Sequence, residues 1–183
     1  MSVGIIVLIV VAVIGLWAVM TYNGFVQGKN QCEEAFSTMD VYLKKRFDLI
    51  PNLVATVKGY AKHESETLEK VISARNAGTR LSPEEKAQDE NQITGAIRQI
   101  FALSESYPDL KANTNFIDLQ GQLKKIEEDI ANSRKYYNAV VKEFNTKCET
   151  IPSVFIANLG HFTKKPLYAV DEAEERKNVK VEF

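Results

Sequence analysis

The stretch that decides the fold is Val3–Met20, which reads VGIIVLIVVAVIGLWAVM and contains no charged residue. With Thr21 and Tyr22 it is 20 residues long, and a helix of that length spans about 30 Å, the thickness of the hydrocarbon core of a bilayer. Trp17 and Tyr22 lie toward one end, and such amphipathic rings favour the membrane interface. Residues 1–22 are therefore predicted to form a transmembrane anchor. The side chains that we expect to contact membrane lipids are Val3, Ile6, Ile9, Val13, Leu16, Trp17, Met20 and Tyr22.

Two other interpretations of this stretch compete with an anchor: a cleaved signal peptide and the buried core helix of a soluble protein. A signal peptide would begin with basic residues, carry a shorter apolar run and end in a small-x-small cleavage site, and the sequence has none of these features. A core helix rarely lacks every charge over such a length. The sequence therefore favours the anchor.

The distribution of basic residues predicts the orientation of the anchor. Only the α-amino group precedes the apolar stretch, whereas Lys29 follows it closely and Lys44, Lys45 and Arg46 follow farther on. Because basic residues are retained on the cytoplasmic side, we expect the N-terminus outside and the remainder of the chain in the cytoplasm.

The composition narrows the classes of function. The chain has 183 residues with 23 Lys and Arg against 24 Asp and Glu, a net charge of −1, and nucleic-acid binding usually needs a basic excess. Cys32 and Cys148 are the two cysteines, and both fall on apolar stripes. We expect them to be buried and reduced, with a disulfide between distant helices as the alternative. His63 and His161 are the two histidines, which leaves little imidazole chemistry.

Beyond the anchor, apolar residues recur in steps of three and four, a spacing that predicts helices almost throughout. Pro51 is expected to end one helix and start the next, so the two helices that meet there should run antiparallel. Pro108 and Pro152 are expected to end the third and fourth helices. The four predicted helices cover residues 32–50, 51–78, 83–107 and 116–148.

The predicted fold is all-α: an N-terminal transmembrane helix followed by an antiparallel four-helix bundle with long helices and a flexible C-terminal tail. Its parts are an anchor over residues 1–22, the bundle over 23–159 and the tail over 160–183. Within the bundle part, Ser153–Leu159 is expected to form a short helix that packs on one end. The tail is assigned from its irregular, charged sequence.

Several blocks along these helices resemble the signature blocks of the LemA family. They are KKRFDLIPNLVATVKGYAKHE at 44–64, the Ala74-Arg75 pair, YPDLKAN at 107–113 and EEDIANSRKYYNAVVKEFN at 127–145. The resemblance covers roughly residues 3–170, with Phe36 standing where a tryptophan is more usual. It implies a bacterial inner-membrane protein with a short external N-terminus and a helical-bundle domain, and it implies no reaction. Some relatives are associated with building internal membrane compartments, which favours a membrane-shaping or scaffolding role by analogy.

Charged residues interrupt the predicted apolar stripes, as Arg46 and Glu64 do. A buried charge needs a partner or must change its protonation state. We therefore predict a polar layer inside the bundle that fixes the register of the helices; the alternative is a set of charges on solvated helix faces. The candidate members of the layer are Arg46, Asp48, Glu64, Arg75, Glu128 and Arg134.

Three glycines are candidates for contacts between copies of the chain. Gly24 and Gly28 form a Gly-x-x-x-Gly pair that would let two helices approach closely. They follow the span in polar sequence, however, which favours a flexible juxtamembrane joint. Gly15 lies between Ala12 and Ala18 on a face of small residues within the span, which suits helix association.

No catalytic, cofactor-binding or metal site is predicted. A di-metal site in a four-helix bundle needs Glu-x-x-His motifs, and the residue three before His63 is Tyr60. His63 also begins no His-Glu-x-x-His motif, because Thr67 occupies the position of the second histidine. We therefore expect neither an enzyme nor a protein that binds a cofactor or a small-molecule substrate.

These observations together predict a membrane-anchored structural or interaction protein that self-associates at the bacterial inner membrane and organises or remodels it. Its expected partners are membrane lipids, further copies of the chain and a protein that the sequence does not identify. The alternative is a membrane-tethered signalling adaptor or receptor component. Only Met1 and Ser2 would lie outside the membrane, which is little for binding an external ligand.

Overall fold

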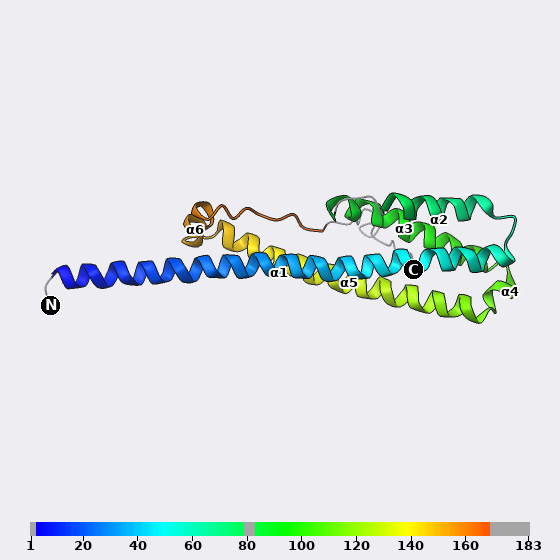
Figure 1. Cartoon of the computed structure of the whole chain (residues 1–183), viewed down its shortest axis with the longest axis horizontal. Coiled ribbons are helices and arrows are strands. Elements are labelled where there is room, and N and C mark those ends of the chain that lie inside the picture. Colours follow the sequence, from blue (N-terminus) through cyan, green and yellow to red (C-terminus); the bar gives the residue numbers. More distant parts are fainter. Residues whose placement is uncertain (1–2, 79–82, 169–183) are drawn as a thin grey trace, which may run out of the picture. The chain divides into compact units, whose positions relative to one another are not determined.

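Figure 1 shows the computed structural model, which describes the backbone of residues 3–78 and 83–168 and the side chains of 3–76 and 92–168. All regular structure in this part of the chain is helical, and it contains no strand. The helices are α1 (Val3–Tyr60), α2 (Ser65–Gly78), α3 (Pro83–Ser104), α4 (Pro108–Lys111), α5 (Thr114–Glu149) and α6 (Ser153–Leu159). The predicted all-α fold with a long apolar N-terminal helix is confirmed.

The helices form two compact units. The first combines the described residues of Met1–Met39 with Asn132–Leu167, and the second is built on Asp40–Ala131. Both units contain parts of α1 and α5, because the division falls within these two helices.

The largest departure from the sequence prediction is at Pro51, which lies inside α1. Proline has no N–H, so the carbonyl of Phe47, four residues earlier, loses its helical hydrogen bond. In the structure Arg75 Nε donates a hydrogen bond to the Phe47 carbonyl oxygen at 3.1 Å. A side chain of α2 thus satisfies the carbonyl that Pro51 leaves without a donor. The prediction that Pro51 ends one helix and starts another, antiparallel to it, is wrong.

The chain reverses ten residues later instead, between Tyr60 and Ser65. The amide of Ala61 still donates to the Val57 carbonyl at 2.8 Å, and the amide of Glu64 then donates to the Ala61 carbonyl at 3.2 Å. Ala61 itself is buried. The apolar stripe that predicts one helix over 51–78 is therefore divided between the end of α1 and α2.

In the second unit, four helical segments run alternately up and down: α1 beyond Met39, α2, α3 and the first part of α5 (Figure 1). Pro108 starts the short helix α4 between α3 and α5. Burying one large aliphatic side chain contributes roughly 1.5–3 kcal/mol to the stability of the fold. The buried apolar side chains include Leu43, Ile50, Leu53 and Val57 of α1, Leu68 and Val71 of α2, Ile93, Ile97 and Ile100 of α3, Leu110 of α4, and Phe116, Leu119, Leu123 and Ile130 of α5.

In the first unit, α1 and α5 pack as an antiparallel pair. The contacts run in opposite directions along the two helices, because Phe25 meets Phe144 at a centroid distance of 6.1 Å and Phe36 meets Tyr137 at 5.7 Å. The buried positions of α1 follow steps of three and four residues, the rhythm of coiled-coil seams; they are Phe25, Gly28, Cys32, Ala35 and Met39.

The C-terminal segment also differs from the prediction. Ser153–Leu159 forms α6, the predicted short helix. Beyond it, the described part of the segment predicted to be a flexible tail, residues 160–168, is bonded to α5. Tyr137 Oη donates to the Pro166 carbonyl at 3.1 Å, and Asn145 makes two hydrogen bonds to the backbone of Lys165. Residues 169–183 of the predicted tail lie outside the described residues.

Candidate functional site: the end of the apolar segment

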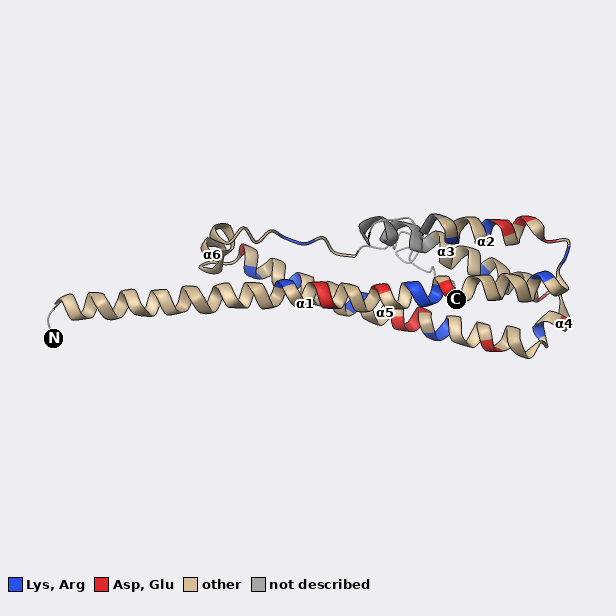
Figure 2. Cartoon of the chain, viewed as in Figure 1, with Lys and Arg blue, Asp and Glu red and all other residues tan. Residues whose placement is uncertain are grey.

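The apolar start of α1 is uncovered. The eight side chains predicted to contact lipid are exposed by 37% at Trp17 to 77% at Val3. In Figure 2 this part of α1 carries no charged residue, and none of its most apolar window is buried. Within the described residues, α1 is the helix long and apolar enough to cross a membrane. A core helix would be covered, so that interpretation does not fit; a signal sequence or a membrane anchor fits both composition and exposure.

The helix does not break where the apolar segment ends. α1 continues through Asn23–Glu34, so the flexible juxtamembrane joint predicted there is wrong. The buried seam against α5 begins at Phe25, three residues after Tyr22. The same helix therefore passes from an uncovered apolar surface into a packed core within one turn.

Three aromatic residues gather at this transition. The ring of Phe162 stacks on Phe25 at a centroid distance of 5.0 Å, with an angle of 14° between the planes. The same ring meets Tyr22 edge-on at 5.4 Å. The backbone makes this approach at Gly160, where a Cβ atom would lie 2.5 Å from the Phe162 ring and 3.2 Å from that of Tyr22. The segment after α6 is therefore fastened to the end of the apolar stretch.

The three candidate self-contact glycines have different surroundings. Gly28 is used within the chain, because a Cβ atom there would lie 3.1 Å from the Phe144 ring, which rests against the bare helix backbone. A Cβ atom at Gly15 or Gly24 would meet nothing within 4 Å. Gly28 is thus a packing residue between α1 and α5, whereas contacts of Gly15 and Gly24 with another copy stay a prediction.

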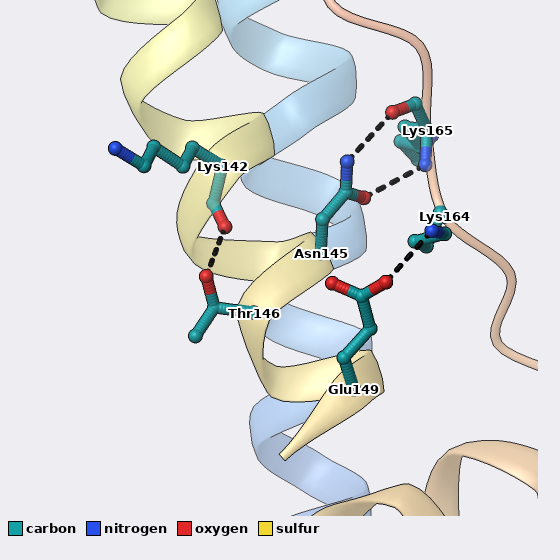
Figure 3. A network of polar contacts seen from close by, with 6 residues as sticks. All are labelled: Lys142, Asn145, Thr146, Glu149, Lys164 and Lys165. Atoms are coloured by element: carbon teal, nitrogen blue, oxygen red, sulfur yellow. Dashed lines mark hydrogen bonds and ion pairs between the residues drawn. The ribbon is translucent and has the colours of Figure 1, made fainter.

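Polar contacts hold the segment after α6 against α5 (Figure 3). Asn145 Nδ2 donates to the Lys165 carbonyl at 2.8 Å, and the Lys165 amide donates to Asn145 Oδ1 at 2.8 Å. The side chains of Lys164 and Lys165 form ion pairs with Glu149 at 2.7 Å and Glu33 at 3.3 Å. The side-chain amide of Asn145 thus bonds both the N–H and the carbonyl of Lys165, as a neighbouring backbone would, and these two hydrogen bonds fix the direction of the segment.

Among the described side chains of the second unit, Arg46 is the buried charge, with its side chain 1% exposed. Its Nη1 donates to Glu127 Oε1 at 3.0 Å and to Thr94 Oγ1 at 3.2 Å, which links α1 to α5 and α3. The predicted burial of Arg46 is confirmed, and the carboxylate partner is Glu127, which the sequence analysis did not select. Glu127 lies on the half-buried side of α5, one residue before the predicted member Glu128, and this position on the helix could have identified it.

The other predicted members of the polar layer do not all gather around Arg46. Arg75 lies near it through its bond to the Phe47 carbonyl. Glu64 accepts a hydrogen bond from Tyr107 Oη at 3.1 Å, where the chain turns after α1. The prediction is wrong for Asp48 and Glu128, which are exposed on solvated helix faces. Arg134 belongs to the first unit, whereas Arg46 belongs to the second.

Three ionisable side chains among the described residues have a pKa that burial raises. Burial raises the pKa of the Cys32 and Cys148 thiols, opposite to the lowered pKa of a nucleophilic cysteine. Both are buried and free, as predicted. Burial and the hydrogen bond to Glu64 raise the pKa of the Tyr107 phenol. These three groups stay protonated at neutral pH.

An open hollow of about 470 Å³ lies between α2 and α3 in the second unit. Its lining residues are Lys70, Ser73, Ala74, Gln92, Gly95, Ala96 and Gln99. Lys70 is the ionisable group among them, and it pairs with Glu66 at 2.8 Å. The described residues contain no group of three His, Cys, Asp or Glu side chains that could hold a metal ion. The described residues that line the hollow therefore offer no pair of groups for acid–base chemistry.

Comparison with known proteins supports the resemblance noted in the sequence. The family model described as "LemA family" matches residues 35–183. The chain is also similar to Protein LemA of Metamycoplasma hominis, with 27% identity over 167 residues that cover 87% of this chain and 73% of that protein. The family match begins within the buried seam of α1, so the apolar segment before it is interpreted from its own composition and exposure.

Proposed function

The chain belongs to the LemA family, and on this premise and the geometry of α1 we propose that it is a single-pass membrane-anchored interaction protein. Its apolar segment crosses the bilayer, and the chain after this segment lies in the cytoplasm. Copies associate side by side at the inner membrane and organise or remodel it.

The observation that carries the proposal is the unbroken passage of α1 from the apolar segment into the packed core. Residues Val3–Met20 have no cover within the described chain, while Phe25 is 1% exposed. Lipid is the solvent that makes such a long exposed apolar surface favourable. The first charged residue, Lys29, comes after the transition, so the span can be buried in hydrocarbon at full length.

The contacts at Tyr22 favour an anchor over a cleaved signal sequence. Cleavage near Met20 would cut the continuous helix α1 just before the point where Tyr22 packs on Phe162 and where the buried seam begins. A signal sequence normally ends in a small-x-small cleavage site, and the end of this apolar segment has no such site. The contact between Tyr22 and Phe162 instead ties the end of the apolar segment to the folded unit.

Tethering supports self-association, because confinement to a surface raises the effective concentration of the copies and lets modest contacts suffice. Gly15 is exposed in the span with open space around it, and small residues at such positions allow close packing of transmembrane helices. The buried link from Arg46 to Glu127 and Thr94 holds three helices in one register, which gives neighbouring copies a defined surface.

The anchor is tested by extracting membranes with alkaline carbonate and measuring the intact mass of the extracted chain. We expect the full-length chain to stay in the membrane. A mature chain that begins after Met20, or one that is released by carbonate, would contradict the anchor.

Self-association is tested by counting photobleaching steps of the labelled full-length chain in vesicles at low protein-to-lipid ratio. Gly15→Leu should lower the share of multi-copy spots, because the added side chain holds neighbouring spans apart. The control Val13→Leu enlarges a residue on the other side of the same span and should leave the distribution unchanged. Single-step spots for the wild-type chain would refute self-association while leaving the anchor intact.

A further inference from the structure

The short helix α6 carries an apolar face that the first unit leaves uncovered. Ile151, Phe155 and Leu159 are 80%, 66% and 79% exposed. Phe155 and Leu159 are four residues apart and share one side of α6, and Ile151 lies in the turn just before the helix. On the opposite side Ala157 is 1% exposed. Single exposed apolar residues are ordinary on a protein surface, whereas three large ones on one short helix and the turn before it mark a contact site.

This face lies at the end of the first unit where the apolar segment of α1 begins. The Phe144 ring packs against Gly28 and Phe25, and α5 continues for five more residues toward the N-terminal end of α1, about 7.5 Å. α6 follows directly, and Gly160 and Phe162 after it contact the ring of Tyr22. α6 therefore sits beside the residue at which α1 would leave the hydrocarbon.

The position of α6 is fixed by hydrogen bonds at both of its ends. At its first residue, Ser153 Oγ donates to the Lys147 carbonyl at 2.7 Å. After it, the Phe162 amide donates to the Ala157 carbonyl at 2.9 Å, and the clamp of Asn145 on Lys165 follows (Figure 3). The apolar face is thus held in place on the unit.

The chemistry of this face suits lipid. The sequence Ile151–Gly160 contains no charged residue, and the nearest charges on either side, Glu149 and Lys164, pair with each other at 2.7 Å. An apolar helix face without basic residues enters the boundary between headgroups and acyl chains by burial of area, with little electrostatic attraction.

We propose that Ile151, Phe155 and Leu159 insert into the membrane leaflet from which α1 emerges, so that α6 is a second, interfacial membrane contact of the chain. This inference rests on the proposed anchor. A single span allows the units to tilt and turn about the membrane normal, and a second contact beside it restricts the tilt.

Fluorescence of the full-length chain in phosphatidylcholine vesicles tests the proposal, because Trp17 is the one tryptophan of the sequence. In the wild-type chain, quenching of Trp17 by brominated lipids reports whether the span is inserted. In a Trp17→Phe background, Phe155→Trp reports on α6. Tyr136→Trp is the matched control, because Tyr136 is exposed to a similar extent, 58%, and lies about 20 Å before the end of α5.

We expect the tryptophan introduced at position 155 to be blue-shifted and quenched by lipids brominated near the headgroup, and the one introduced at position 136 to be neither. The quenching should be the same at low and high salt, because burial of apolar area drives it. Far-UV circular dichroism checks that both variants keep the helical content of the wild-type chain.

The remaining outcomes overturn the inference in distinguishable ways. An unquenched, water-exposed tryptophan at position 155 beside a quenched Trp17 would refute the α6 contact and leave the anchor standing. A blue shift without quenching that grows with protein concentration would show that a second copy covers the face. An unquenched Trp17 would refute the anchor itself.

Discussion

The hydrogen bond between Arg75 and the Phe47 carbonyl explains how α1 continues through Pro51, and a double-mutant cycle tests this explanation. Arg75→Met removes the donor and keeps most of the apolar stem of the side chain. The donor is a charged guanidinium at 3.1 Å from a partly buried oxygen, and hydrogen bonds to charged groups contribute about 1.5–3 kcal/mol. We expect Arg75→Met to lower the free energy of unfolding by about 2 kcal/mol.

The second arm of the cycle supplies the missing backbone donor. In Pro51→Ala, the new N–H at position 51 can donate to the Phe47 carbonyl, as in an ordinary helix. Arg75→Met should then cost only about 0.5 kcal/mol, so the coupling energy between the two sites is about 1.5 kcal/mol. Pro51→Ala alone should stabilise the chain by less than the ~3 kcal/mol of an unrelieved interior proline, because Arg75 already satisfies the carbonyl.

The cycle is measured by guanidinium unfolding of the detergent-solubilised full-length chain, followed by far-UV circular dichroism. In a thermal scan, a loss of about 2 kcal/mol would lower the Tm by about 4–8 °C for a chain of this size. Arg98→Met, at an exposed position of α3, is the control and should change stability by less than about 0.5 kcal/mol. An equal cost of Arg75→Met in both backgrounds would refute the proposed role of Arg75.

Two further predictions concern packing and pH. Gly28→Leu should destabilise the chain by about 2 kcal/mol, because the side chain would displace the Phe144 ring, whereas Gly24→Leu points into open space and should leave the unfolding midpoint unchanged. Burial and the bond to Glu64 raise the pKa of the Tyr107 phenol, so the folded state binds this proton more tightly than the unfolded state does. The stabilisation that comes from this tighter binding is therefore complete below the ordinary tyrosine pKa of about 10, and it is lost as the pH rises through the raised pKa of the folded state. In a pH series of unfolding curves, the free energy of unfolding should fall less steeply above pH ~10 for Tyr107→Phe than for the wild-type chain. Identical slopes would contradict the assignment.

The sequence was sufficient for features that depend on local pattern. The apolar segment, the helical periodicity and the start of α3 at Pro83 and of α6 at Ser153 all appear in the structure. Each depends on residues that are near one another along the chain. The burial of Arg46 also followed from its place in the apolar stripe, because a helix face is determined by spacing alone.

The sequence misled where a distant residue changes the outcome. Pro51 breaks helices by local rules, and the donor that relieves it, Arg75, lies 28 positions farther along the chain. The turn after Tyr60 contains no proline, so the apolar spacing predicted one helix that continues across it. Glu127 was passed over for Glu128 because a shift of one position on a helix rotates a side chain by about 100°. The clamp of Asn145 on Lys165 depends on the tertiary placement of the C-terminal segment, which no local pattern specifies.

The exposure pattern of α1 adds a constraint that its composition does not contain. The apolar segment ends at Met20, and the buried seam begins at Phe25, so four residues separate the two environments. Four residues of helix span about 6 Å, which is about the thickness of the headgroup layer of a bilayer. With the span in the bilayer, the end of the first unit therefore reaches the headgroups whichever way the helix tilts. The side chains at that end must suit this environment, and a neutral, apolar α6 beside Tyr22 does so, whereas a charged or strongly solvated helix there would pull the span outward.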